Sequence, residues 1–169
     1  EKFFNGIDLR SLHKDEQNPW LIWIASGKGL IRFDTRTKQL KLFNERDGMA
    51  NSYVYGILED DKHNLWLSTN GGLIYFDRKN NSFQNFSAND GLQSNEFNTG
   101  AFYKSASGNF YFGGIKGFNW FKNINPDLTD YAHKPSVAVT DIFLNDRRFK
   151  ESSEFLKNKT INLSYYQNN

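Results

Sequence analysis

The chain repeats one short pattern three times, and this repeat constrains the fold more than any other feature. In each copy an aromatic residue precedes a glycine by six positions and a phenylalanine by ten. The matching residues are Trp23, Gly29 and Phe33, then Trp66, Gly72 and Phe76, and then Tyr111, Gly117 and Phe121. The second copy lies 43 residues after the first, and the third lies 45 residues after the second. A fixed period of this length indicates a repeat architecture.

Each copy has the sequence of a β-hairpin. In residues 64–77, two apolar runs rich in aromatic and β-branched residues flank a turn with Gly71 and Gly72. Both runs are too short for a helix, and glycine suits the positive φ angles of a tight turn. Further short strands are expected around each hairpin. The predicted strands are residues 5–12, 21–26, 30–34 and 40–44 in the first unit, 53–58, 65–68, 73–76 and 82–86 in the second, and 97–104, 110–113 and 118–121 in the third.

Four short antiparallel strands in one such period are typical of a β-propeller blade. We therefore predict an all-β chain with about three four-stranded β-propeller blades in residues 1–126. The propeller is incomplete, because closed propellers have about four to eight blades. The third unit loses its fourth strand to an exit segment at residues 122–126. Glu1 stands inside what reads as an ongoing fold, so we expect the chain to be a piece of a longer protein.

The repeat stops after Pro126, and a different β-domain is expected to begin. Residues 127–134 are polar and read as a linker. Residues 136–145 and 160–166 have the composition of strands, with a return of the chain at 147–150. We predict that residues 135–169 form the first strands of an immunoglobulin-like β-sandwich that this chain does not complete.

The composition excludes several classes of protein. Aromatic residues make up 17% of the chain, which suits short strands that bury rings and argues against disorder. Lys and Arg (21) nearly balance Asp and Glu (19), so no strong attraction to nucleic acid is expected. The chain has no cysteine and no apolar run near the roughly 18 residues that span a bilayer.

No pattern of catalytic, cofactor or metal-binding residues stands out. The histidines, His13, His63 and His133, have no partners at ligand spacing, and we expect His63 to be a solvated turn residue. The acidic run at residues 59–61 reads as a strand end and turn rather than a catalytic pair. Residues 27–29 lack the remainder of a phosphate-binding loop. We therefore predict no catalytic residue, no cofactor and no metal in this chain.

The repeated aromatic residues have two readings. Trp23, Trp66 and Tyr111 could stack on sugars, but each stands at the same point of a central strand, where rings pack between blades. Packing is therefore the favoured role for them, as it is for Phe33, Phe76 and Phe121. Gly29, Gly72 and Gly117 are predicted turn positions.

A ligand surface is expected where the turn between the second and third strands of each blade meets the link to the next blade. In a propeller these segments open on one face, near the central channel. Asn, Arg and Lys there can hydrogen-bond to sugar hydroxyls or carboxylates. The candidate ligand-binding residues are Lys28, Arg46, Asn51, Asn70, Ser94, Asn95, Asn98 and Lys116. The alternative is that these are ordinary solvated loops.

Three stretches together resemble a known family. Residues 60–77 look like the two-component regulator propeller repeat, and residues 91–101 with 111–114 look like the last propeller blade of the same family. Residues 135–149 with 161–168 are similar to the start of the Tyr-Tyr-Tyr domain that follows it. The sequence departs from the repeat where Asn18–Trp23 replaces the usual Gly-Leu-Trp approach and where Lys28 precedes Gly29 in place of Gly-Gly. Neither change removes the glycine of the turn.

The resemblance implies the periplasmic sensor region of a Bacteroidetes hybrid two-component system. Such a region has two seven-bladed propellers and an immunoglobulin-like sandwich, followed by a membrane helix and a cytoplasmic histidine kinase. It implies that this chain is non-enzymatic and that the intact protein is a homodimer detecting a glycan-derived oligosaccharide. Two alternatives remain open: a propeller scaffold for protein partners, and a propeller lyase.

Overall fold

The computed structural model describes residues 4–122, 143–144 and 147–148. The chain divides into two compact units, Glu1–Asn125 and Pro126–Asn169. The predicted boundaries at residues 126 and 134, and the domain types assigned to each side, stay predictions.

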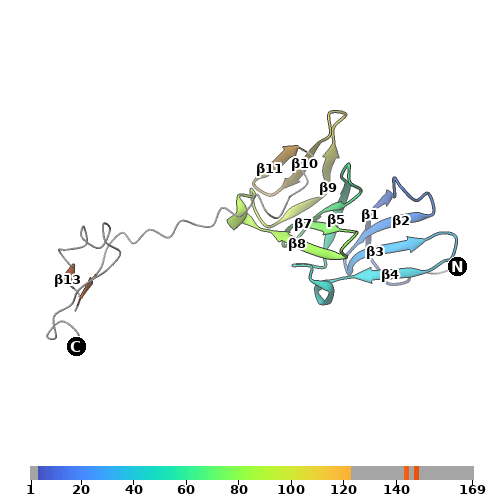
Figure 1. The fold of residues 1–169 in the computed structure, drawn as a ribbon, viewed down its shortest axis with the longest axis horizontal. Helices are drawn as coiled ribbons and strands as arrows, with labels where there is room; N and C mark the ends of the chain where they lie inside the picture. Colours follow the sequence, from blue (N-terminus) through green and yellow to red (C-terminus); the bar gives the residue numbers. More distant parts are fainter. Residues whose placement is uncertain (1–3, 123–142, 145–146, 149–169) are drawn as a thin grey trace. The chain divides into compact units, whose positions relative to one another are not determined.

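The first unit consists of three antiparallel sheets, which we call blades 1, 2 and 3 (Figure 1). Blade 1 contains β1 (Leu9–Lys14), β2 (Leu21–Ser26), β3 (Gly29–Asp34) and β4 (Leu40–Phe43). Blade 2 contains β5 (Val54–Glu59), β6 (Leu65–Thr69), β7 (Gly72–Asp77) and β8 (Ser82–Phe86). Blade 3 contains β9 (Phe97–Lys104), β10 (Asn109–Gly114) and β11 (Gly117–Lys122). In each blade the strands pair in chain order, and β5 lies against both β1 and β9. This arrangement confirms the predicted all-β fold of incomplete propeller type.

The three central hairpins share one register. Trp23 pairs with Arg32, Trp66 with Tyr75, and Tyr111 with Trp120. In all three, a two-residue turn connects the strands, and the glycine that follows it has a φ angle of 134° (Gly29), 112° (Gly72) or 118° (Gly117). Such angles strain residues with a Cβ, which explains why glycine recurs at this point of the repeat.

The first strand lies further along the chain than predicted. Residues 5–12 were expected to form it, but β1 is Leu9–Lys14. Its backbone pairs with β2 through His13↔Trp23 and Lys14↔Ile22, so pairing with the apolar β2 extends the strand into polar residues. The weak alternation of residues 5–12 could not reveal this, because the register depends on the neighbouring strand.

Two short 3₁₀ helices connect the blades: η1 (Glu45–Asp47) after blade 1 and η2 (Ala88–Asp90) after blade 2. Both begin with a capping box, formed by Asn44 with Asp47 and by Ser87 with Asp90. Each ends at a glycine with a positive φ angle, 106° and 94° respectively. Both links therefore leave their blades in the same way.

Two apolar clusters bind neighbouring blades together. Between blades 1 and 2, Trp23 packs edge-on against Phe76, with ring centroids 5.8 Å apart. Between blades 2 and 3, Trp66 packs against Phe121 at 4.7 Å, beside the buried Phe110. Trp23 and Trp66 are 2% and 6% exposed. Each repeat thus buries its tryptophan against the blade that follows, as stacked repeats require.

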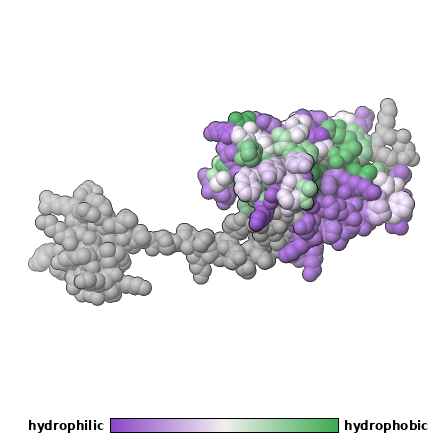
Figure 2. All heavy atoms as spheres, turned by 90° about the horizontal axis from the view of Figure 1, so that it is seen from above, coloured by the Kyte–Doolittle hydropathy of each residue, from purple (hydrophilic) through white to green (hydrophobic). Residues whose placement is uncertain are grey.

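The far face of blade 3 has no described blade against it. Tyr103, Tyr111 and Trp120 lie in one cross-strand row on that face, and Phe118 lies beside them. Tyr103, Phe118 and Trp120 are each at least 60% exposed, and Tyr111 is only half-buried. Figure 2 shows that hydrophobic residues reach the surface on one face of this unit, beside broad hydrophilic areas.

In the second unit the structure describes one strand pair, β12 (Phe143–Leu144) with β13 (Arg147–Arg148). They are antiparallel, in keeping with the predicted return of the chain after residue 145. The predicted linker, the other predicted strands of residues 135–169 and His133 lie outside the described residues. Within the described ranges no helix has the length and apolar character needed to cross a bilayer.

Candidate functional site

A charged cluster lies between blades 1 and 2, at the end of β5. Its centre is Glu59, whose carboxylate is fully buried. His13 Nε2 from β1 and His63 Nδ1 from the β5–β6 turn each lie 2.7 Å from a different oxygen of that carboxylate. The backbone N–H of Glu16 donates a third hydrogen bond to it at 3.1 Å. A buried carboxylate is stable only with such partners, which here come from both blades.

Arg78 extends the cluster across the interface. From the β7–β8 turn its guanidinium reaches Asp15 of blade 1 at 2.5 Å and Glu59 at 3.4 Å, and it donates to the His63 carbonyl at 2.8 Å. The same guanidinium lies 5.2 Å from the ring centre of Trp23. Asp15 is also buried and accepts a hydrogen bond from Trp23 Nε1 at 2.8 Å. One arginine therefore pairs with two buried carboxylates, one from each blade.

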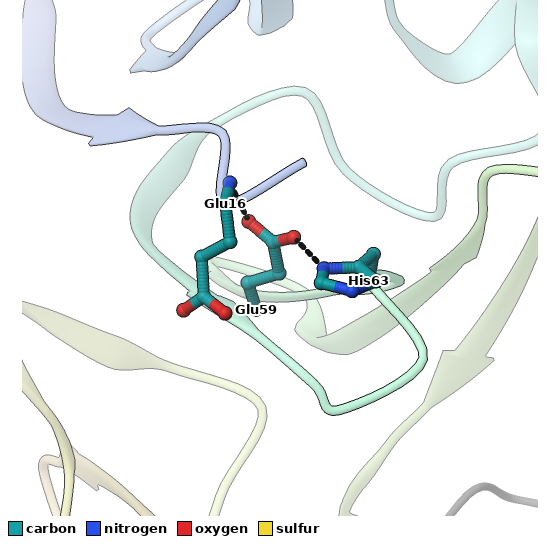
Figure 3. A group of neighbouring side chains, drawn as sticks. All are labelled: Glu16, Glu59 and His63. Carbon is teal, nitrogen blue, oxygen red and sulfur yellow. Dashed lines mark hydrogen bonds and ion pairs between the residues drawn. The ribbon is translucent and has the colours of Figure 1, made fainter. Parts of the chain in front are cut away.

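Three members of this region could be read as a metal site. Ligand atoms of Glu16, Glu59 and His63 lie within 4.8 Å of one another. In Figure 3, however, the side chain of Glu16 extends away from the Glu59 carboxylate, which it contacts only through its backbone N–H. The Glu59 carboxylate already pairs with the Arg78 cation at 3.4 Å. The geometry therefore favours a salt-bridge cluster that joins the blades.

The cluster makes the interface sensitive to acid. Burial would raise the pKa of Glu59, but the hydrogen bonds from His13, His63 and the Glu16 amide outweigh burial and hold that pKa below its usual range. A lowered folded-state pKa stabilises the fold above the unfolded value of about 4.5, and this stabilisation is lost as the pH falls through the folded value. We therefore expect the free energy of unfolding to decrease as the pH is lowered from about 5 through the range where carboxylates titrate.

The Glu59→Gln variant tests this assignment. It removes the titrating group and weakens its charged hydrogen bonds, so we expect a loss of about 1–3 kcal/mol at pH 7. Urea unfolding at pH 7 and pH 4 should show a smaller acid-induced loss in the variant than in the original chain. An equal acid-induced loss in both would show that other carboxylates set the acid sensitivity.

Sequence reasoning did not find this cluster. The sequence predicted no partners at ligand spacing for either histidine and a solvated His63, whereas His13 lies in β1 and both rings are part-buried against Glu59. A signal did exist in the departures from the repeat. Arg78 stands where blade 1 has Thr35, and Glu59 stands where the register places Lys14 and Lys104 in the other blades.

Of the predicted ligand residues, Asn98 lies in β9 and the others lie in the blade turns and links. One turn and the neighbouring links are in contact. The backbone N–H of Gly72 donates to the Asn95 carbonyl at 2.7 Å, and that of Asn70 to the Tyr53 carbonyl at 3.2 Å. A Cβ on Gly71 would lie 2.7 Å from the Cβ of Asn51. The structure thus gathers Asn51, Asn70 and Asn95 around the β6–β7 turn.

Several of these side chains already serve the fold. Asn51 and Asn95 each accept a backbone N–H through Oδ1, at 2.8 and 2.6 Å, which leaves their amide N–H groups for other partners. Ser94 accepts from the Glu96 N–H at 3.3 Å. The remaining candidates are exposed: Lys28 in the β2–β3 turn, Arg46 in η1, Asn98 in β9 and Lys116 in the β10–β11 turn.

A second group near these loops was not predicted. Arg10 of β1 hydrogen-bonds to Asp8 and to the hydroxyl of Tyr53, and its guanidinium carbon lies 4.8 Å from the Tyr53 ring centre. The Tyr55 ring packs on Tyr53, with centroids 5.2 Å apart, and its hydroxyl lies 3.4 Å from Asn70 Oδ1. Aromatic rings and a cation therefore adjoin the asparagine group.

Comparison with known proteins agrees with this architecture. The family model described as "Two component regulator propeller" matches residues 48–71, which run from the end of η1 through β6 into the β6–β7 turn. No curated protein matches the chain.

Solved structures extend the similarity over the propeller unit. The extracellular domain of the putative hybrid two component system BT3049 from B. thetaiotaomicron is 26% identical, with a TM-score of 0.66 over 73% of this chain. That of BT4673 from the same organism shares the fold, at 19% identity and a TM-score of 0.56 over 70% of this chain. The chain covers only 16% and 17% of those two structures. Residues 48–71 therefore match the two-component regulator propeller repeat, and the chain resembles the extracellular domains of putative hybrid two-component systems from B. thetaiotaomicron, as its sequence motifs predicted.

Proposed function

We propose that this chain is a non-catalytic part of a sensor that detects a glycan-derived oligosaccharide and signals across the membrane to a histidine kinase. The chain is periplasmic, in keeping with relatives that are extracellular domains. The kinase, the membrane anchor and the pairing of two sensor subunits belong to the parent protein in this proposal.

The observation that supports ligand detection is the grouping of polar side chains where the blade turns meet the blade links. Asn51, Asn70 and Asn95 surround one turn, and the rings of Tyr53 and Tyr55 adjoin it. Amides that hydrogen-bond to hydroxyls, next to aromatic faces, are a combination suited to sugars. The apolar stacking of the blades holds these loops on a rigid support.

The proposal is tested by thermal unfolding of the chain and of the intact sensor with a panel of neutral and acidic oligosaccharides. We expect one glycan class to raise the melting temperature, because ligands that bind only the folded state stabilise it. Replacing Asn98 and Lys28 together with alanine should reduce that shift. Both side chains are exposed and form no side-chain hydrogen bond with another residue in the range 4–122.

A scaffold for protein partners would behave differently. It would show no shift with any glycan, and the double variant would have no effect. That outcome would contradict the sensor proposal for this surface.

A further inference from the structure

A cavity of about 310 Å³ lies between blades 1 and 2, beside the Glu59 cluster and away from the predicted ligand loops. Blade 1 contributes Arg32 and Trp23 to its wall, and blade 2 contributes Lys62, Arg78 and Lys79. These side chains come from β2, β3 and the turns that follow β5 and β7. The volume is at the lower end of the range of about 300–1,000 Å³ that is usual for small-molecule sites.

The wall of this cavity carries a strong excess of positive charge. Four of the described lining residues are cations, namely Arg32, Lys62, Arg78 and Lys79. No described lining residue is an Asp or a Glu. The charge of Arg78 is compensated by its ion pairs with the buried carboxylates of Asp15 and Glu59. Arg32, Lys62 and Lys79 form no ion pair with any residue between 4 and 122.

Three acidic residues adjoin the lining residues in sequence, namely Glu16, Asp61 and Asp77. A carboxylate oxygen of Glu16 lies within 4.8 Å of ligand atoms of Glu59 and His63. Asp61 faces Lys104 of blade 3 at 3.5 Å. Asp77 accepts hydrogen bonds from the backbone N–H groups of Lys79 and Asn80, at 2.9 and 3.0 Å. The charge of Lys79 therefore acts on Asp77, whereas Arg32 and Lys62 have no ion-pair partner between residues 4 and 122 and are available to an anion.

The other lining groups match the remainder of a sugar. Gln17 and Asn81 supply amides at the edge of the cavity, and Trp23, Phe43 and Phe76 supply an apolar floor. Arg78 is held in place by its contacts with Asp15 and Trp23, so one cation is fixed before any ligand arrives. A preformed cation, exposed lysines and apolar lining residues favour a compact ligand with one anionic group.

We propose that this cavity binds the anionic substituent of an acidic oligosaccharide, which is a sugar carboxylate or a sugar sulfate. The inference rests on the proposed sensor function and gives its ligand a chemical class. It also assigns binding to the seam between blades 1 and 2, so the ligand would contact both blades at once.

The test is calorimetric titration of the full chain with a digalacturonate, with a 6-sulfated N-acetylglucosamine and with the neutral disaccharide galactobiose. We expect one acidic probe to bind, the neutral probe not to bind, and the affinity to fall as salt is added. The Arg32→Gln and Lys62→Gln double variant should bind the acidic probe at least about tenfold more weakly, since each charged hydrogen bond contributes about 1.5–3 kcal/mol. Both residues are exposed, so the fold should survive the change.

A comparison variant, Lys28→Ala with Asn98→Ala, removes side chains of the predicted ligand loops instead and so distinguishes the two sites. If this comparison variant loses the acidic probe while the Arg32 and Lys62 variant retains it, the cavity proposal is overturned and the sensor proposal survives. Equal binding of acidic and neutral probes would also overturn it. Inorganic sulfate that binds as tightly as the sulfated sugar would mean an adventitious ion only and would overturn the sugar assignment.

Discussion

Replacing Gly72 with alanine is expected to destabilise the chain by about 3 kcal/mol or more. Two effects add at this position. The φ angle of 112° strains any residue with a Cβ. A Cβ there would also overlap the carbonyl oxygen of Phe86 and lie 3.0 Å from its carbonyl carbon, so β8 would have to move away from β7. Urea unfolding followed by circular dichroism measures the loss.

Gly117 supplies a control in the same chain. It occupies the matching position of blade 3 with a φ angle of 118°. No described atom lies within 4 Å of a Cβ placed there, since the described residues include no fourth strand beside β11. Gly117→Ala should therefore cost only the backbone strain, about 1–2 kcal/mol. Equal losses in the two variants would show that the fourth strand places no steric demand on the glycine.

The Phe76→Ala variant is expected to lose about 3–5 kcal/mol. The Phe76 ring is 2% exposed and stacks on Phe83 with centroids 4.4 Å apart. It also packs against the rings of Phe43 and Trp23 of blade 1, with ring centroids 5.1 and 5.8 Å apart. Its removal would leave a cavity at the centre of the seam between blades 1 and 2, which rigid neighbours can fill only in part.

Phe118→Ala is the matched control, because it removes the same side chain from the exposed face of blade 3, where Phe118 is 62% exposed. Its effect should stay within about 0.5 kcal/mol. Guanidinium unfolding of both variants at one temperature gives the comparison. A similar loss at Phe118 would mean that the far face of blade 3 is packed in solution.

The fold could be predicted because the sequence repeats its own local signals. The spacing of Trp66, Gly72 and Phe76 fixes a strand, a turn and a second strand, and the same spacing around Trp23 and Tyr111 fixes the blade period. The 3₁₀ helices in the two blade links also end alike, at Gly48 and Gly91. Signals within a few residues of each other are sufficient for these features.

The charged cluster and the cavity could not be predicted in the same way. His13 meets Glu59 across 46 positions, and Arg78 meets Asp15 across 63. Such contacts depend on how two blades stack, which no local spacing encodes. The predicted start of β1 was wrong for a related reason, because the extent of this strand is decided by its pairing with β2. The repeat also predicts that Tyr111 packs between two blades, but no described blade lies against its aromatic row.

The alternation of buried and exposed rings has a spectroscopic consequence. The chain has four tryptophans, of which Trp23 and Trp66 are 2% and 6% exposed while Trp20 and Trp120 are 51% and 60% exposed. Indole emission should therefore divide into a component that acrylamide quenches readily and one that it barely reaches. Because Trp23 reports on the seam between blades 1 and 2 and Trp66 on the next one, single-tryptophan variants would let each seam be followed separately by its own intrinsic fluorophore.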